Sequence, residues 1–152
     1  MIITFCGHSK IYGEQEELQR KVLSAIEEAA EGKDVTFYLG GYGSFDSIAL
    51  CAAKRYKEEH PASRLLFILP YFGKEYFASK ETYIKKCDDT LYPELEKTPK
   101  RLAISKRNEW MIKSADYVIA YVDHSWGGAA KALLFAHKRK TPYRNLGNKV
   151  FD

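Results

Sequence analysis

Four short segments of this sequence combine glycine with serine, histidine or aromatic residues, a combination suited to holding a phosphorylated ligand. They are Gly7-His8-Ser9, Gly40-Gly41-Tyr42-Gly43-Ser44, Tyr71-Phe72-Gly73-Lys74 and Asp123-His124-Ser125-Trp126-Gly127-Gly128. Glycine lets backbone N–H groups approach a ligand closely. A helix that begins directly afterwards adds unpaired N–H donors and the positive end of its dipole. These segments therefore predict an anion site built from backbone amides, with tight strand-to-helix turns as the simpler alternative.

The second segment does not match the common nucleotide-binding loops. It reads YLGGYGSFD, so the glycines are not followed by the Lys-Ser/Thr pair of a Walker loop. It is not a GxGxxG dinucleotide fingerprint either. Nucleotide hydrolysis of the Walker type and hydride transfer are therefore disfavoured.

A cationic side chain is expected to face the interior near these turns. Arg107 and Asn108 stand between Ile104 and Met111 in a helical pattern, three and four residues from each, so they point along the apolar stripe. A guanidinium facing inward needs a carboxylate, carbonyl groups or a ligand phosphate as its partner. Two interpretations stay open: a structural ion pair, with Asp116 as a candidate, and a clamp on the phosphate or ribose of a ligand.

Histidine and aspartate residues in the same segments have several interpretations. His8 and His124 both follow predicted strands, and one of them could contact a ligand; no metal site is expected, because a third ligand is not evident. Asp46 lies in the first turn of a predicted helix, where a carboxylate serves as a cap or dipole partner. A contact with a ribose hydroxyl is the alternative for Asp46 and for Asp123.

Aromatic residues border the glycines. Tyr42 and Trp126 could each stack on a base, and packing against the protein is the alternative. The neighbouring pair Tyr71 and Phe72 carries the same two interpretations.

The elements that must position these residues follow from the hydrophobic pattern. Short β-branched and aromatic runs predict strands over residues 2–6, 35–39, 65–69, 117–122 and 143–146. Helical spacing of apolar residues predicts helices over about 14–31, from 45 to before Pro61, and over about 100–114 and 128–138. Between 71 and 100 the pattern is weaker, with a short helix expected near 79–86.

This alternation predicts an α/β fold, a single Rossmann-like open parallel sheet with helices on both faces. Ligands in such sheets bind beyond the carboxyl ends of the strands, where the strand order reverses. The four glycine-containing segments each follow a predicted strand. The sequence therefore predicts one site at this edge of the sheet.

The composition of the chain argues against several classes of protein. The chain has 152 residues and a mass of 17.4 kDa, which suits one domain over residues 1–152. Hydrophobic residues make up 45% and charged residues 29%, so neither disorder nor a membrane protein is expected. The start of the chain lacks the pattern of a secretory signal. Three cysteines without a CxxC pair favour a reducing, cytoplasmic location over a disulfide framework or a zinc site.

Charge is distributed unevenly. Residues 1–96 carry 12 basic and 16 acidic side chains, hence 12 − 16 = −4, whereas residues 97–152 carry 12 and 4, hence 12 − 4 = +8. A basic C-terminal third fits an anionic small ligand, an asymmetric surface or nucleic acid. Nucleic acid is not expected as a partner, because the longest basic run is Lys138-Arg139-Lys140.

Three motifs together resemble the SLOG superfamily. They are FCGHS after the first strand, LGGYGSFDSIALCAA after the second, and SKRNEWMIKSADYVIAYVDHSWGGAAKALLFA toward the end. This Rossmann-like group contains the lonely-guy (LOG) nucleotide hydrolases, the DprA core, and small bacterial or phage proteins of unknown function. The likeness to those small proteins is the greatest and covers nearly the whole chain. The resemblance implies a nucleotide-derived ligand on two glycine loops and a homodimer or higher homo-oligomer.

Hydrolase chemistry is not carried over completely. The hydrolases use an arginine on the helix before the last glycine loop, and chain order places it at Arg107. Their glutamate, in PGGxGTxxE, corresponds to Lys131 or to Ser47, depending on the loop that is aligned. Neither residue is a carboxylate, so cleavage of an N-glycosidic bond would need Asp46 or Asp123 instead.

The sequence thus predicts a cytoplasmic domain that binds or senses a nucleotide-derived phosphorylated ligand, either a nucleoside monophosphate or an ADP-ribose-like compound, without a cofactor, metal or membrane. The residues expected to bind it are Gly7, His8, Gly40, Gly41, Tyr42, Gly43, Ser44, Arg107, Asn108, Ser125, Trp126, Gly127 and Gly128. The first alternative is a nucleotide N-glycosidase with Arg107, Asp46 and Asp123 as catalytic residues. The second is single-stranded DNA binding, suggested by the DprA relationship.

Overall fold

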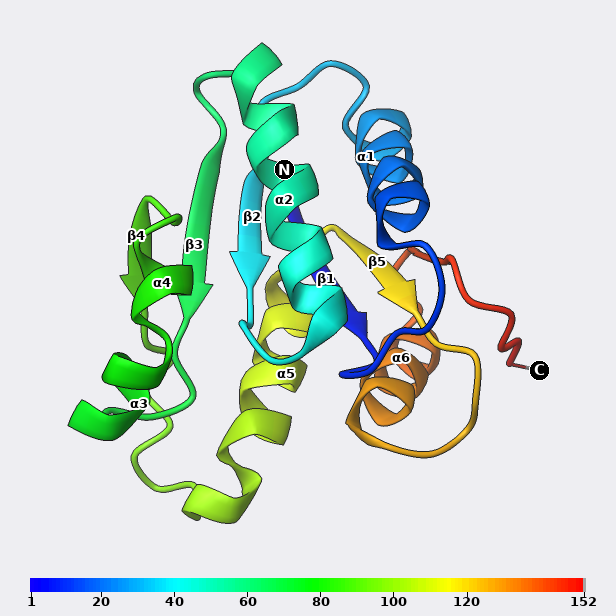
Figure 1. The fold of residues 1–152 in the computed structure, drawn as a ribbon. Helices are drawn as coiled ribbons and strands as arrows, with labels where there is room; N and C mark the ends of the chain where they lie inside the picture. The colour runs from blue at the N-terminus through cyan, green and yellow to red at the C-terminus, as the bar shows by residue number, and fades with distance from the viewer. Residues whose placement is uncertain (152) are drawn as a thin grey trace.

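The computed structural model describes residues 1–151, in which six parallel strands form one sheet (Figure 1). The strands are β1 (Ile2–Gly7), β2 (Thr36–Leu39), β3 (Arg64–Ile68), β4 (Asp89–Leu91), β5 (Tyr117–Tyr121) and β6 (Tyr143–Asn145). Their order across the sheet is β4-β3-β2-β1-β5-β6. The predicted class, an open parallel α/β sheet of the Rossmann type, is confirmed.

Helices cover both faces of this sheet. They are α1 (Gln15–Ala30), α2 (Ser44–Glu59), α3 (Lys74–Ser79), α4 (Glu81–Ile84), the 3-10 helix η1 (Lys100–Leu102), α5 (Ala103–Ser114) and α6 (Gly128–Arg139). The apolar stripes of α1 and α2 pack into one core cluster with Phe37 and Ile119. Ile112 of α5 and Leu133 of α6 pack into a second cluster with Val118. Within residues 1–151, no helix combines the length and apolar character needed to cross a bilayer.

The region between β3 and α5 differs from the prediction. The single helix expected near residues 79–86 is two short helices, α3 and α4, and β4 was not predicted. β4 is a three-residue edge strand that begins with an aspartate, so it has no apolar run for the sequence to reveal. Asp88 tethers it, because its carboxylate accepts the amide of Leu65 at 2.7 Å and pairs with Lys57 at 2.7 Å.

The strand order fixes where a ligand can bind. The chain moves outward from β1 through β4 and then returns to place β5 on the other side of β1, so the order reverses between β1 and β5. Gly7 at the end of β1 pairs with Tyr121 at the end of β5, and the amide of His8 donates to the Tyr121 carbonyl at 3.2 Å. The residues after these two strands therefore lie side by side.

Candidate functional site

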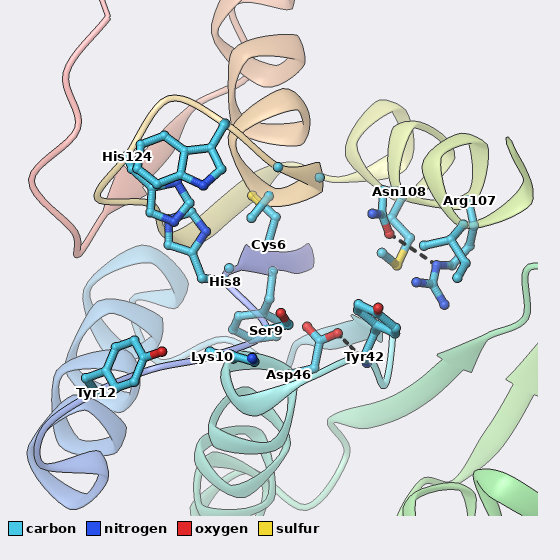
Figure 2. Close-up of a pocket in the computed structure, with 18 residues that line it drawn as sticks. Cys6, His8, Ser9, Lys10, Tyr12, Tyr42, Asp46, Arg107, Asn108 and His124 are labelled. Atoms are coloured by element: carbon cyan, nitrogen blue, oxygen red, sulfur yellow. Dashed lines mark hydrogen bonds between the residues drawn. The ribbon is translucent and has the colours of Figure 1, made fainter. Parts of the chain in front are cut away.

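A cavity of about 510 Å³ opens at this reversal point (Figure 2). It is lined by residues from the loop after β1, the turn before α2, the inner face of α5 and the turn before α6. The lining residues are Phe5, Cys6, Gly7, His8, Ser9, Lys10, Tyr12, Tyr42, Asp46, Ile104, Arg107, Asn108, Met111, His124, Trp126, Gly127, Gly128 and Ala129. The cavity thus joins three of the four glycine-containing segments with α5.

Arg107 is the buried cation of the cavity, with only 1% of its surface exposed. Its Nη1 donates to the carbonyl of Gly40 at 2.8 Å and to that of Ile68 at 3.3 Å, and its Nε donates to Asn108 Oδ1 at 3.2 Å. Among residues 1–151, no carboxylate forms an ion pair with it. Asp116, the partner considered from sequence, instead accepts the amide of Ile2 at 2.7 Å. A buried charge held by neutral acceptors alone is well placed to attract an anion.

Asp46 is the carboxylate of the cavity. It lies in the first turn of α2, where its charge can interact with the helix dipole, and its Oδ2 accepts the amide of Tyr42, the residue before the N-cap Gly43, at 2.6 Å. No side chain within residues 1–151 caps α2 itself. Burial raises the pKa of Asp46 to about 6, against the opposing effects of the Tyr42 amide and of the positive charges on Arg107 and Lys80. The side chain therefore changes its charge near neutral pH.

Two amides of the turn before α2 are hydrogen-bonded within the protein. The amide of Tyr42 is bound by Asp46, and that of Ser44 donates to the carbonyl of Ser9 at 2.8 Å. Gly41 and Gly43 have φ values of +71° and +90°, which favour glycine. Of this turn, only Tyr42 lines the main cavity. Gly41, Gly43 and Ser44 line a neighbouring cavity, and Gly40 is buried against Arg107.

The turn before α6 leaves its amides available. Gly127 has a φ of +92° and stands at the N-cap of α6, where no side chain caps the helix. No acceptor within residues 1–151 takes the amides of Gly127 or Gly128, and both glycines line the cavity. Unpaired amides at the start of a 12-residue helix form a favourable position for an anion. Ser125 is exposed and does not line the cavity.

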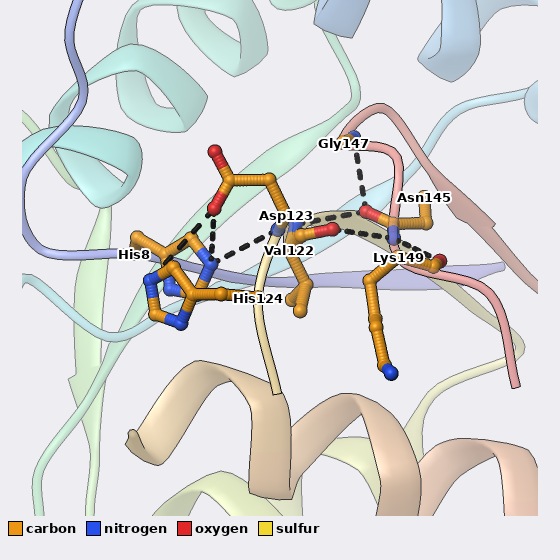
Figure 3. A network of polar contacts seen from close by, with 7 residues as sticks. All are labelled: His8, Val122, Asp123, His124, Asn145, Gly147 and Lys149. Carbon is orange, nitrogen blue, oxygen red and sulfur yellow. Dashed lines mark hydrogen bonds and ion pairs between the residues drawn. The ribbon is translucent and has the colours of Figure 1, made fainter. Parts of the chain in front are cut away.

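Two histidines and an aspartate meet where β1 and β5 end (Figure 3). The amide of Asp123 donates to His8 Nε2 at 3.0 Å, and Asp123 Oδ1 lies 3.2 Å from the same nitrogen. Burial and the nearby His124 lower the pKa of His8, although Asp123 opposes them. Asp123 does not line the cavity, so the two aspartates considered as catalytic residues do not both face it. Asp123 is also the third potential metal ligand that sequence reasoning did not identify.

Exposed aromatic side chains stand around the mouth of the cavity. Tyr12, Tyr42 and Trp126 are 86%, 56% and 70% exposed. Trp126 stacks on His124 with ring centroids 3.8 Å apart, and His124 stacks on His8 at 3.7 Å. Tyr12 and Lys10 were missed by the sequence analysis, although they follow directly on the Gly7-His8-Ser9 segment and could have been found by extending it.

Comparison with known proteins reveals shared folds. No family model matches the sequence, and no curated protein matches it significantly. DNA processing protein A from Helicobacter pylori, studied for its single-stranded DNA binding mode, matches with a TM-score of 0.64 and 16% identity over 100% of this chain and 67% of that chain. DprA from Streptococcus pneumoniae matches with a TM-score of 0.66 and 14% identity, over 99% of this chain and 51% of that chain. The Moco carrier protein of Chlamydomonas rheinhardtii matches with a TM-score of 0.51 and 16% identity, over 95% of this chain and 74% of that chain.

These matches concern the fold. The chain spans about half the length of the S. pneumoniae protein. The DprA-like fold agrees with the SLOG resemblance, whereas the closer likeness to small bacterial or phage members stays a prediction, as does the homo-oligomer.

The comparisons correct the expectation about nucleic acid. We expected no nucleic-acid partner because the sequence has no long basic run, and that expectation is wrong: the H. pylori protein that shares this fold binds single-stranded DNA. The physical reason is that basic side chains gather in space and need not adjoin in sequence. Arg101 and Lys131, for example, line one cavity from two different helical segments.

Proposed function

We propose that residues 1–152 form a single domain that binds a nucleotide-derived phosphorylated ligand in the cavity between β1 and β5. The observation that carries this proposal is the pairing of a buried arginine with an uncapped helix N-terminus in one cavity. Arg107 has only neutral hydrogen-bond partners, and α6 begins with amides that no acceptor takes within the described chain. Both features attract the same chemical group, a phosphate or pyrophosphate.

The rest of the cavity suits the remainder of a nucleotide. The amide oxygen of Asn108 is engaged by Arg107, so its amide nitrogen is available as a donor to a ligand oxygen (Figure 2). Tyr42 and Trp126 border the opening with exposed rings, and such rings provide stacking surfaces for a base. A volume of about 510 Å³ is within the range of small-molecule sites.

Calorimetric titration with nucleoside monophosphates and ADP-ribose tests this proposal. We expect saturable binding to the natural protein and a loss of about 10- to 100-fold in affinity for Arg107→Met, because hydrogen bonds to charged groups contribute about 1.5–3 kcal/mol. Arg55→Met removes an exposed arginine on α2 and is the matched control, with unchanged affinity expected.

Two results would count against this function. One is the absence of heat and of thermal stabilisation across a broad panel of nucleotides and ADP-ribose relatives. The other is Arg107→Met protein that remains folded, judged by its melting curve, and binds as tightly as the natural protein.

Single-stranded DNA is a second candidate ligand, favoured by the continuity of the surface. Ile104, Asn108 and Gly128 line both the main cavity and a second cavity that Arg101 and Lys131 border. Exposed rings beside a basic path are the features that hold unpaired bases and phosphates. The H. pylori DprA of the same fold binds single-stranded DNA.

Fluorescence anisotropy with labelled oligonucleotides distinguishes the two ligands. If DNA binds through this path, affinity should fall steeply with salt, and Lys131→Gln should reduce the slope by about 1 in log units. Lys54→Gln, at an exposed position of α2, is the control. Affinity that does not depend on salt, or no binding at low salt, would eliminate this candidate.

A further inference from the structure

The cluster of His8, Asp123 and His124 carries an inference that goes beyond nucleotide binding. Each residue offers one ligand atom, and these atoms all lie within 4.8 Å of one another. The residues follow β1 and β5, so the sheet itself brings them together from opposite ends of the sequence (Figure 3). We infer that they form a binding site for a divalent transition-metal ion of the zinc class.

The separations of the ligand atoms fit such an ion. Asp123 Oδ1 lies 3.2 Å from His8 Nε2 and 3.7 Å from His124 Nε2. Ligand atoms at about 2.0–2.2 Å from a tetrahedral zinc ion are about 3.3–3.6 Å apart. These two distances bracket this range, and all three ligand atoms lie within 4.8 Å of one another, so a tilt of the His124 ring would bring the three atoms to an ion. Two imidazoles and one carboxylate are also a ligand set that zinc uses.

The polar groups of the cluster are poorly satisfied without a cation. His8 Nε2 accepts the amide of Asp123, so its lone pair is on the side where Asp123 Oδ1, also an acceptor, lies 3.2 Å away. His124 Nδ1 is shielded from solvent and has no hydrogen-bond partner among the described residues. Its other nitrogen, Nε2, is 3.7 Å from the carboxylate, which is too long for a hydrogen bond. A cation between His8 Nε2, His124 Nε2 and Asp123 Oδ1 would give these three acceptors a favourable partner, whereas His124 Nδ1 then carries the ring proton and does not contact the ion.

Occupation of the site should leave a structural signature. The rings of His8 and His124 are stacked with an angle of 11° between their planes, and an ion cannot lie in both planes at once. His124 must therefore tilt, and the ion takes over His8 Nε2 from the Asp123 amide. Because Trp126 stacks on the other face of His124, the tilt should change the surroundings of the indole and its fluorescence.

The position of the ion gives it access to the cavity. His8 and His124 line the cavity, whereas Asp123 does not. Three protein ligands leave a tetrahedral ion one open position, which a water molecule or a ligand oxygen can take. The metal site itself does not depend on the identity of the phosphorylated ligand.

The test is titration of tag-free protein with Co²⁺ and Zn²⁺, followed by calorimetry, Co²⁺ absorption and tryptophan fluorescence. The protein carries Cys51→Ser in all samples, because the exposed thiol of Cys51 would compete for these ions. We expect one ion per chain, and at least about tenfold weaker binding for His124→Gln and for Asp123→Asn, since each removes one ligand. His60→Gln is the matched control, because His60 stacks on Tyr56 at the far end of α2.

His124 is 29% exposed and Asp123 41% exposed at their side chains, so substitution there should leave the fold intact, and melting curves check this. The inference is overturned if no ion binds saturably, if the His124 and Asp123 variants bind as tightly as the parent, or if His60→Gln loses binding to the same extent. It is supported if the fluorescence change accompanies binding and disappears with His124→Gln.

Discussion

The two glycine-rich turns, before α2 and before α6, share a backbone conformation at the helix N-cap but differ in their surroundings. Gly43 and Gly127 both stand at a helix N-cap, with φ and ψ of 90° and −174° in one and 92° and 172° in the other. A Cβ on Gly43 would overlap the Cα of Ser9, whereas a Cβ on Gly127 would meet nothing within 4 Å. The turn before α2 is closely packed against Ser9, and the turn before α6 is an open surface of the cavity.

The difference comes from what surrounds each turn. Two amides of the turn before α2, those of Tyr42 and Ser44, find acceptors in Asp46 and in the carbonyl of Ser9, so these two are not free for a ligand. The turn before α6 has no such neighbour within residues 1–151, and its amides remain open. A glycine at a helix N-cap can therefore be closely packed or open, and the neighbouring elements decide which.

The largest effect is expected from Gly43→Ala, which disrupts the close packing of the turn before α2 against Ser9. Unfavourable backbone geometry costs about 1–3 kcal/mol for a residue other than glycine, and the overlap with the Ser9 backbone adds about 1–3 kcal/mol. We therefore expect a loss of about 3 kcal/mol or more in the free energy of unfolding, measured with urea. Gly127→Ala is the matched control, because it carries the same backbone strain without the overlap. Equal losses in the two variants would show that the close contact between Gly43 and Ser9 does not affect the free energy of unfolding.

A smaller effect is expected from Asp46→Asn, which alters the acceptor of the Tyr42 amide in the turn before α2. Because burial raises the pKa of Asp46 to about 6, the folded chain binds this proton more tightly than the unfolded chain. The resulting stability is fully present below the unfolded pKa and is lost as pH rises through about 6. Relative to Asp46→Asn, the natural protein should lose about 2–2.5 kcal/mol between pH 4 and pH 7.5. Parallel stability curves for the two proteins would contradict this.

The same variant sharpens the comparison at the level of the ligand. Ionised Asp46 adds negative charge beside Arg107, so affinity for ADP-ribose should fall as pH rises through about 6 in the natural protein and stay level in Asp46→Asn.

Chromatography of the same mixtures shows whether base is released. Since Asp46 lines the cavity and Asp123 does not, release that is lost only in Asp123→Asn would contradict a catalytic role for Asp46.

The smallest effect on stability is expected from Gly128→Ala, in the open turn. Gly128 does not have a positive φ, and a Cβ there would meet nothing within 4 Å. We expect the free energy of unfolding to change by less than about 1 kcal/mol, toward higher stability if anything. The affinity for a phosphorylated ligand should nevertheless fall, because the new methyl group stands beside the open amides. Unchanged affinity would argue that the ligand does not approach α6.

The sequence predicted the regular elements well, because each contains a periodic pattern of its own. The structure begins and ends α1 within one residue of the predicted range, and the sheet edge that holds the cavity was expected from the alternation of strands and helices. The inward position of Arg107 followed from its spacing between Ile104 and Met111. β4 was missed because a three-residue polar edge strand has no pattern to detect.

What the sequence by itself determined is the parallel sheet, the helices on its two faces and the edge at which glycines, histidines and an arginine gather, because backbone sterics and apolar periodicity act within short windows of the chain. Only the tertiary structure decided which amides are open, that no carboxylate within residues 1–151 forms an ion pair with Arg107, and that Asp123 lies against His8 from 115 residues away. Those outcomes depend on hydrogen bonds and close contacts between elements that are distant in sequence, and no local pattern encodes them.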